Sequence, residues 1–581
     1  MKEKWKILNK LCGRSKEKAK YCEFIINKGV KVHNEKCIAD AFNDFYINVG
    51  PTLANKIDSA NVKLSYDEFL IDINCKSSMF VAPTNENEVI NIVSKFASKS
   101  SQDVYGLNMK VIKGIMQVII KPFTHICNMS LKSGVFPNDL KIAKVLPLFK
   151  SGEKSEVSNY RPVSILPQLS KIIEKLFEIR LRRYIDEKGF LFKGQYGFRK
   201  NHSTNLALNE MVNMIVDALD NKMYSIGVFI DLKKAFDTVD HELLIDKFRY
   251  YGIRGIASNF LKSYLSNRTQ FVKYKDTVSS KQEVLCGVPQ GSILGPLLFI
   301  LYINDMHKVS ELLHFIIFAD DTNIFYLDKN PNRLVSVINT ELVKLSQWFK
   351  LNKLSLNVQK SNYMLFSNKK VATLPIKLDG VELARVTFTK FLGVIIDEKF
   401  TWIHHIETVK KKICKAIGSM YRIRDKVDND SLLMIYNALI LPYLMYCCEL
   451  WGNTYCIRIN RLKLLQKRAV RKINNAEYRD HTSALFKKYR ILKLEDLITL
   501  HTCLVMYKAS NCLLPKNVQS QFVKKQDIHG YNTRKKGELH KSSVNSSLKH
   551  MSTNIRGVRL WNEIDCKIRN SMSINVFKYK L

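Results

Sequence analysis

Acidic residues are scarce in this chain of 581 residues. Asp and Glu number 53 against 92 Lys and Arg, so the formal net charge at pH 7 is +39. So many positive side chains repel one another in a folded protein, and the simplest explanation for retaining them is a polyanionic partner. We therefore expect a nucleic acid as the partner, with an anionic membrane surface as the alternative.

The cysteine spacing typical of zinc sites is also missing. The 13 cysteines are scattered, and no two of them stand in a C-x2-C pattern, so the sequence predicts neither a zinc knuckle nor a disulfide framework. The N-terminal residues MKEKWK carry charges where a secretory signal would be apolar. We expect a reducing intracellular compartment.

Long apolar runs are few. Residues 432–451 have the length of a membrane span, but Asn437, Pro442 and Glu449 interrupt them, which favours a buried helical hairpin and no contact with membrane. With only 23 Gly and 13 Pro but 46% hydrophobic residues, the composition excludes low complexity and wholesale disorder. The length indicates several domains.

Positive charge concentrates near the C-terminus. Residues 398–581 hold 35 basic and 14 acidic residues. Within them, Arg458 to Lys472 show helical spacing, with Ile459, Leu462, Leu465 and Ala469 along one side. The pattern predicts a helix whose basic side chains contact RNA phosphates; the alternative is a solvated face. The predicted contacts are Arg461, Lys467, Arg468 and Arg471.

Two apolar runs end in aspartates. Ile226–Ile230 is followed by Asp231, and Phe315–Phe318 is followed closely by Asp320 and Asp321 before a second run. Acidic groups at strand ends are costly to bury unless they are paired or bind a cation, so together they indicate a site for hard cations. The alternative for each is a turn aspartate that caps its own backbone.

A glycine-rich loop, Cys286–Pro296, lies between these acidic sites. Its three glycines and two prolines fix a backbone that can approach a flat or anionic ligand closely. A loop that only leads into the following apolar helix is the alternative.

Seven motifs in order give the sequence a specific resemblance. They are RPVSILP (161–167), QYGFR (195–199), FIDLKKAFD (229–237), GVPQGS (287–292), FADD (318–321), LNVQK (356–360) and FLGV (391–394). The chain resembles the reverse transcriptases of Jockey-like non-LTR retrotransposons, strongly over residues 131–397. Weaker matches flank this region, at AFNDFY (41–46), LLQKRA (464–469) and YNTR (531–534).

The resemblance implies an α+β fold, the right-handed polymerase of fingers, palm and thumb. A mostly helical N-terminal extension would occupy residues 1–130, fingers and palm 131–397, and a thumb with the basic helical region 398–515. Residues 516–581 would form a basic C-terminal tail, which its polar composition predicts to be loosely ordered.

The resemblance also implies the site. Asp231 and Asp320 would be the main ligands of two Mg²⁺ ions, with Mn²⁺ as the alternative metal; the Leu232 carbonyl and the Asp321 carboxylate would assist. Lys360 would protonate the leaving pyrophosphate. Phe318, Lys233 and Ser361 depart from the residues usual in the family, and none of these departures removes a metal ligand.

Further roles follow from the same resemblance. Phe236 would exclude a ribose 2′-OH, with a plain core aromatic as the alternative. Gln290 and Gly291 would lie against the incoming nucleotide and template, where a side chain on the glycine would collide. The triphosphate would contact Arg161, Arg199 and Lys200. The primer end would be gripped by Phe391, Leu392, Gly393 and Val394.

The function implied is RNA-directed DNA polymerisation, with an RNA template, a DNA primer or nicked target DNA, and dNTPs. We expect a ribonucleoprotein in nucleus and cytoplasm. About 130 residues precede the fingers, too few for an endonuclease, so we expect a truncated reading frame and an endonuclease supplied elsewhere. The alternatives are a catalytically inactive RNA-binding remnant and a nuclease that uses the three carboxylates.

Overall fold

A five-stranded sheet forms the middle of the molecule. The computed structural model describes residues 2–14, 22–27, 29–57, 66–70, 75–369, 375–528 and 537–581. The strand order is β14-β11-β5-β10-β9, and neighbours are antiparallel except β11 and β14. The strands are β5 (Tyr224–Ile230), β9 (His314–Phe318), β10 (Asp321–Asp328), β11 (Asn362–Phe366) and β14 (Ala384–Arg385).

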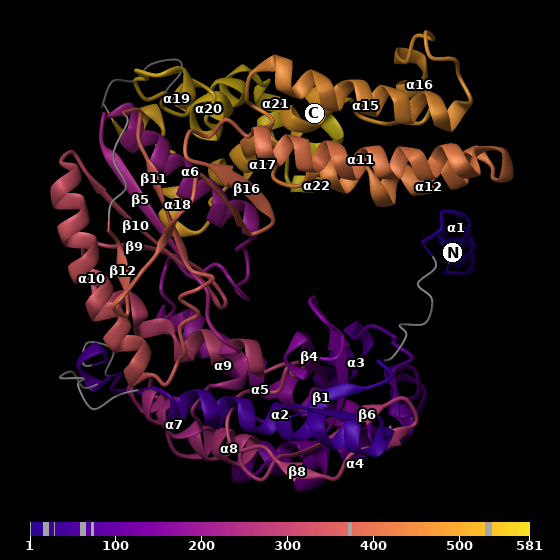
Figure 1. Ribbon diagram of the computed structural model, residues 1–581, viewed down its shortest axis with the longest axis vertical. Coiled ribbons are helices and arrows are strands. Elements are labelled where there is room, and N and C mark those ends of the chain that lie inside the picture. The colour runs from indigo at the N-terminus through magenta and orange to yellow at the C-terminus, as the bar shows by residue number, and fades with distance from the viewer. Residues whose placement is uncertain are drawn as a thin grey trace.

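Side chains that alternate along these strands give the sheet two buried faces. Ile226, Val228 and Ile230 of β5 join one hydrophobic cluster, whereas Phe229 joins another. The first face packs against α9 (Gly295–Tyr302) and α10 (Pro331–Leu351), and the second against α6 (Thr204–Asp220). Helices therefore cover both faces of the central sheet (Figure 1).

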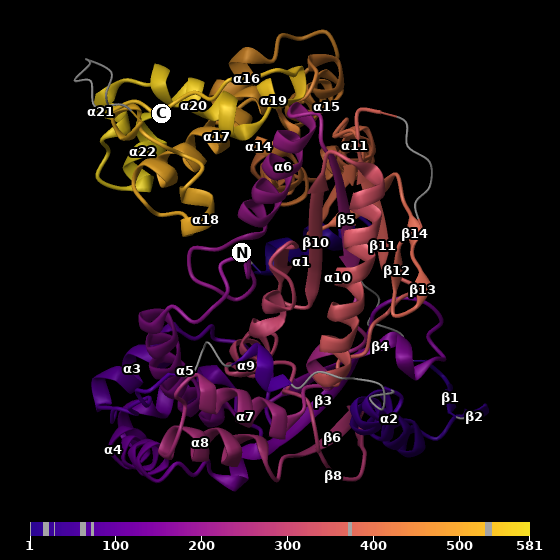
Figure 2. The same cartoon turned by 90° about the vertical axis from the view of Figure 1, so that its left-hand side faces the viewer.

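A second region lies at one end of this sheet (Figures 1 and 2). Its own sheet runs β4-β3-β6-β7, with β8 also paired to β6. The strands are β3 (Ile142–Phe149), β4 (Tyr160–Ile165), β6 (Thr269–Tyr274), β7 (Thr277–Val278) and β8 (Gln282–Glu283). The helices around it are α2 (Glu35–Asn55), α3 (Glu86–Lys95), α4 (Met109–Ser133), α5 (Gln168–Lys188), α7 (His241–Tyr250) and α8 (Ile256–Leu265).

The C-terminal region at the other end of the central sheet is helical. It begins after the hairpins β12 (Lys377–Leu378) with β13 (Val381–Glu382) and β15 (Phe388–Phe391) with β16 (Val394–Asp397). Its longer helices are α11 (Ile403–Ile423), α12 (Asn429–Leu439), α15 (Cys456–Asn474), α17 (Leu494–Ser510) and α20 (Thr553–Glu563). The shorter ones are α13 (Leu441–Met445), α14 (Cys448–Trp451), α16 (Ser483–Lys488), α18 (Lys516–Gln519), α19 (Ser547–His550), α21 (Cys566–Arg569) and α22 (Ile574–Lys580).

The expectation of a loosely ordered tail after residue 515 is wrong for the described residues. Trp561 of α20 and Phe577 of α22 are buried against Tyr507 of α17. Ile555, Val558 and Trp561 follow at three-residue steps, so even a polar segment can present an apolar stripe. The motif at 531–534 lies outside the described residues.

The apolar stretch 432–451 folds as three short helices, α12, α13 and α14, with breaks at Ile440 and Tyr446. Leu432, Ile435 and Leu444 are buried among the C-terminal helices. In the described part of the chain, every helix is too short or too polar to cross a membrane.

The N-terminus contacts both ends of the molecule. Leu8 of α1 (Lys2–Leu11) joins the hydrophobic cluster of the C-terminal helices, and Lys4 lies 3.5 Å from Asp428 at the start of α12. Ile25 of β1 (Ile25–Asn27), which pairs with β2 (Val30–Val32), belongs instead to the cluster around β3 and β6. In Figure 1, α1 lies on the open side between these two regions.

Candidate active site

The predicted strand, acidic turn and strand are confirmed. Asp321 pairs with Phe318 across the turn from β9 to β10, and Ala319 turns the chain with a φ of 57°. Because Thr322 of β10 pairs with Ile230 of β5, the next residue, Asp231, comes out beside Asp320 and Asp321. The pairing of β5 with β10 therefore brings together three carboxylates, those of Asp231, Asp320 and Asp321, from two distant parts of the sequence.

Burial and neighbouring charges disfavour the ionised forms of Asp320 and Asp321. Burial, followed by the charges of Asp320 and Asp231, raises the pKa of Asp321 to about 6. Burial also raises the pKa of Asp320, with Asp231 adding to the shift and Arg161 and Lys150 partly offsetting it. A divalent cation would relieve this repulsion, and carboxylate oxygens are the ligands that Mg²⁺ prefers, so the residues fit the metal expected.

Asp231 is held by a neighbour that the sequence analysis did not single out. Asn357 donates from Nδ2 to Asp231 Oδ2 (2.7 Å) and from its backbone N–H to the Asp231 carbonyl (2.9 Å). The Asp231 N–H donates to Ser361 Oγ (3.1 Å). Asn357 stands inside the motif LNVQK, so its place in that motif was the available signal.

A cavity of about 830 Å³ opens in front of the carboxylates. Nine of the predicted residues line it: Arg161, Asp231, Leu232, Phe236, Gln290, Gly291, Asp320, Asp321 and Lys360. The lining also contains two basic residues that the sequence analysis did not predict there, Lys150 and Lys234. Acidic and basic groups thus face one space, which suits a metal-bound polyphosphate.

Phe236 is both packed and presented to the cavity. Its ring stacks on Phe299 of α9, with 4.4 Å between centroids, and meets Phe198 edge-on at 6.3 Å. Phe236 therefore packs on other aromatic side chains and also lines the cavity, and its predicted steric role stays a prediction.

Gly291 lines the cavity, and a side chain there would also strike the protein. Its φ is 130°, and a Cβ would lie 2.5 Å from the Ser164 carbonyl oxygen of β4. A close approach within the protein therefore requires glycine at this position, and the contact with nucleotide and template stays a prediction.

Arg199 and Lys200 are absent from the described lining of the cavity. The Arg199 guanidinium donates to the carbonyls of Phe192 (2.6 Å) and Gln195 (3.2 Å), so it braces its own loop. Burial lowers the pKa of this arginine. The structure does not bring these two predicted triphosphate contacts to the carboxylates.

The predicted primer-end hairpin, β15 and β16, lies next to the acidic turn. Its turn is formed by Leu392 and Gly393, with φ of 44° and 85°, while Phe391 and Val394 are buried. A cavity of about 200 Å³ is lined by Leu392 and Phe391 together with Asp231, Asp321 and Lys360. The Tyr446 hydroxyl donates to the Leu392 carbonyl (2.5 Å), which links this turn to the C-terminal helices.

The predicted basic helix exists as α15, and Ile459, Leu462 and Ala469 bury its apolar side. Its predicted RNA contacts partly engage the protein itself. Arg461 pairs with Glu407 of α11 (2.8 Å), Arg468 lies over the Tyr421 ring, and Arg471 donates to the Asp480 carbonyl (2.9 Å). Lys467 is exposed.

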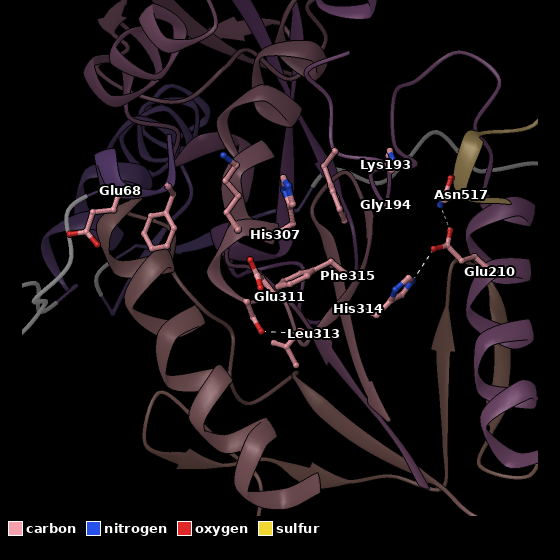
Figure 3. Close-up of a pocket in the computed structure, with 14 residues that line it drawn as sticks. Glu68, Lys193, Gly194, Glu210, His307, Glu311, Leu313, His314, Phe315 and Asn517 are labelled. Atoms are coloured by element: carbon pink, nitrogen blue, oxygen red, sulfur yellow. Dashed lines mark hydrogen bonds and ion pairs between the residues drawn. The ribbon is translucent and has the colours of Figure 1, made fainter. Parts of the chain in front are cut away.

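A second cavity, of about 540 Å³, lies at the β9 edge of the sheet (Figure 3). Glu210 of α6 accepts hydrogen bonds there from Tyr196, from Asn517 of α18 (2.5 Å) and from the ring of His314 (2.8 Å). With Glu68 and Glu311 also in its lining, this cavity suits a polyphosphate less well than the first. The hydrogen bonds of Glu210 connect Asn517 of α18 with His314 of β9.

Comparison with known proteins agrees with this site. Residues 150–396 match the family described as Reverse transcriptase (RNA-dependent DNA polymerase). Residues 150–396 are therefore similar to a reverse transcriptase domain, and all three carboxylates lie within the matched residues.

Individual relatives indicate the kind of reverse transcriptase that the chain resembles. The chain is 29% identical over 420 residues to the RNA-directed DNA polymerase from mobile element jockey of Drosophila melanogaster, covering 70% of this chain and 46% of the relative. It is 27% identical over 438 residues to the probable RNA-directed DNA polymerase from transposon X-element of the same species, covering 73% and 48%. The resemblance to non-LTR retrotransposon polymerases is confirmed. The chain spans about half the length of these relatives.

Proposed function

We propose that this chain is the RNA-directed DNA polymerase of a non-LTR retrotransposon, which extends a primer 3′-OH with dNTPs on an RNA template. The observation that carries the proposal is the convergence of Asp231, Asp320 and Asp321 on the cavity that Phe236 and Gln290 also line. A DNA primer or nicked target DNA would supply the 3′-OH, and an endonuclease acting elsewhere would supply the nick.

The roles of the residues follow from their positions. Asp231 and Asp320 would hold two Mg²⁺ ions with help from the Leu232 carbonyl and Asp321. Two such ions activate the attacking hydroxyl and stabilise the leaving pyrophosphate. Lys360, which lines both cavities beside the carboxylates, would give a proton to the pyrophosphate.

The remaining architecture is assigned by the same reasoning. Residues 131–397 would be fingers and palm, with the two sheets as their cores, and residues 398–515 the thumb. Residues 1–130 would form an N-terminal extension, most of it beside the fingers and α1 on the thumb, and the tail from 516 would pack on the thumb. The net charge of +39 supports a ribonucleoprotein, which would occur in cytoplasm and nucleus.

Incubation of purified protein with an RNA template, an annealed DNA primer, dNTPs and Mg²⁺ tests the proposal. We expect primer extension, abolished in Asp231→Ala and Asp320→Ala and reduced less in Asp321→Ala, with RNA binding preserved in all three. RNA retention without extension would identify a non-catalytic remnant, and cleavage of the RNA would identify a nuclease. Extension by the Asp320→Ala variant would contradict the assignment of the carboxylates.

A further inference from the structure

The loop from Gly287 to Ser292 is fixed to the chain on two sides. On one side, the N–H groups of Gly287 and Val288 donate to the carbonyls of Val239 (2.8 Å) and Phe236 (2.9 Å). On the other, the Ser164 N–H of β4 donates to the Gln290 carbonyl (3.0 Å). The backbone on which Gln290 is mounted is therefore set by main-chain bonds.

The Gln290 side chain has a separate anchor. Its Nε2 donates to Asp237 Oδ1, at 2.7 Å. An ionised carboxylate only accepts hydrogen bonds, whereas a glutamine amide has one donating and one accepting end. Facing Asp237, the amide can therefore take only one of its two orientations, with its nitrogen toward Asp237 and its oxygen turned away.

Asp237 is itself confined by a helix outside the matched reverse transcriptase domain. The Cys286 thiol donates to the Asp237 carbonyl (3.4 Å). A Cβ on Gly50 of α2 would lie 2.4 Å from that carbonyl oxygen and 2.4 Å from Cys286 Sγ. Only a glycine lets α2 pack so closely beneath the segment that carries Asp237.

We propose that Asp237 is a positioning residue that orients the Gln290 amide toward the incoming nucleotide, and that Gly50 of α2 keeps Asp237 in place. Gln290 touches the nucleotide, and Asp237 acts only through Gln290. The N-terminal helix α2 is thereby part of nucleotide selection. This inference rests on the proposed polymerase function.

A double-mutant cycle in primer extension tests the link. Asp237→Ala should raise the KM for dNTP roughly tenfold and change kcat less, because the lost hydrogen bond orients the amide and does not enter the chemistry. In a Gln290→Ala background the same substitution should leave KM unchanged. Asp237→Asn should fall between, since its amide can accept from Gln290 but also permits the flipped orientation. Equal effects of Asp237→Ala in the two backgrounds would overturn the proposal.

Two matched control substitutions distinguish a loss of Gln290 orientation from non-specific disruption of the fold. Asp240 stands three residues further on, caps α7 through the Leu243 N–H and pairs with Lys353 (2.6 Å), so Asp240→Asn should leave the KM for dNTP unchanged. Gly50→Ala should raise KM as Asp237→Ala does. Gly114→Ala, in α4, should have no effect, since a Cβ there meets nothing within 4 Å.

Hydrogen–deuterium exchange on the nucleotide-free protein keeps the two proposals distinguishable. Gly50→Ala should speed exchange of peptides covering 286–292, because its Cβ would displace the backbone at Asp237. Asp237→Ala and Gly114→Ala should not, because the main-chain bonds of the loop remain. If wild-type protein fails to extend primers but this pattern holds, the polymerase function fails and the role of Gly50 stands. Unchanged exchange in Gly50→Ala overturns that role.

Discussion

At the level of single residues, the raised pKa of Asp321 predicts that Mg²⁺ binding at the acidic turn depends on pH. Asp321 has a folded-state pKa of about 6, above that of an unfolded aspartate, so its ionisation destabilises the fold as pH rises through this range. A protonated carboxyl does not bind Mg²⁺. We therefore expect Mg²⁺ to raise the unfolding temperature at pH 7.5 and to do so much less at pH 5.

Differential scanning fluorimetry with and without Mg²⁺ measures this effect. Asp320→Asn should abolish the Mg²⁺-dependent shift, whereas Asp276→Asn, at an exposed position away from the cavity, should retain it. A shift of equal size at both pH values would mean that the carboxylates do not bind the ion.

Phe236 decides the choice of sugar if its ring limits the cavity. Phe236→Val removes the ring, so we expect ribonucleotide incorporation to rise relative to deoxynucleotide incorporation by roughly tenfold or more. Single-nucleotide extension assays give the ratio. Phe299→Leu removes the stacking partner behind the ring and serves as a control for lost packing. An unaltered ratio in Phe236→Val would leave Phe236 as a core residue only.

At the level of elements, Glu449 of α14 has a buried carboxyl group whose hydrogen-bonding capacity is only partly satisfied. It is 1% exposed, and it accepts one hydrogen bond from Asn205 of α6 (2.7 Å), while Oε2 has no partner among the described residues. Burial raises the pKa of this carboxyl. A raised pKa means that the fold loses stability as pH rises above the ordinary carboxyl range.

Glu449→Gln should therefore stabilise the protein at pH 8, by about 1–3 kcal/mol, and much less at pH 4. Urea unfolding at the two pH values measures the difference. Glu495→Gln on α17, at an exposed position, should show no such gain. Possible ligand atoms of Cys448 and His501 lie within 4.8 Å of Glu449, so a chelator that destabilises only the wild type would point to bound metal in place of a proton.

The helix α15 should carry much of the non-specific grip on RNA. Replacing Arg461, Lys467, Arg468 and Arg471 with Gln keeps helix propensity while removing charge. The dissociation constant at low salt should rise alike for unrelated RNAs. The log–log salt slope should shrink by about two to three units, since each single-strand phosphate contact contributes ~0.7. Arg461 should contribute least, because it already pairs with Glu407.

Fluorescence anisotropy over a salt series gives the slope. A control variant with the same change in charge replaces exposed lysines on α3 and α4 with Gln: Lys95, Lys110, Lys121 and Lys132. Equal slopes for the two variants would show that charge alone, and not its position on α15, determines RNA affinity.

Helix ends show where local signals suffice. Glycine is favoured directly after a helix, and Gly189 ends α5 there with a left-handed φ of 66°. Serine is a common helix cap, but Ser170 does not cap α5: the helix begins at Gln168 after Pro167, and Ser170 Oγ donates to Glu174 (3.0 Å). At the start of α5 the Gln168 N–H donates to Asp103 Oδ2 (2.8 Å), a partner far away in the sequence that helical spacing does not reveal.

At the scale of the whole molecule, the sequence predicted what lies in short motifs. Strand ends that carry aspartates, and the order of the motifs, were enough to place Asp231, Asp320, Asp321, Gln290 and Lys360 around one cavity. The position of Arg199 was not predictable, because its partners are carbonyls of a folded loop. The contact of Gly50 with Asp237 was not predictable either, since it joins segments far apart in the chain.

The position of α1 has a topological consequence. Leu8 of α1 packs with the C-terminal helices and Ile25 of β1 packs at the opposite end, so the N-terminal part of the chain connects these two regions on the open side of the molecule (Figure 1). A linear template could pass this connection by its free end, whereas a covalently closed RNA circle could enter only after α1 detaches. Leu8→Asp should therefore speed association with primed circles while leaving association with linear RNA little changed, as stopped-flow fluorescence would reveal.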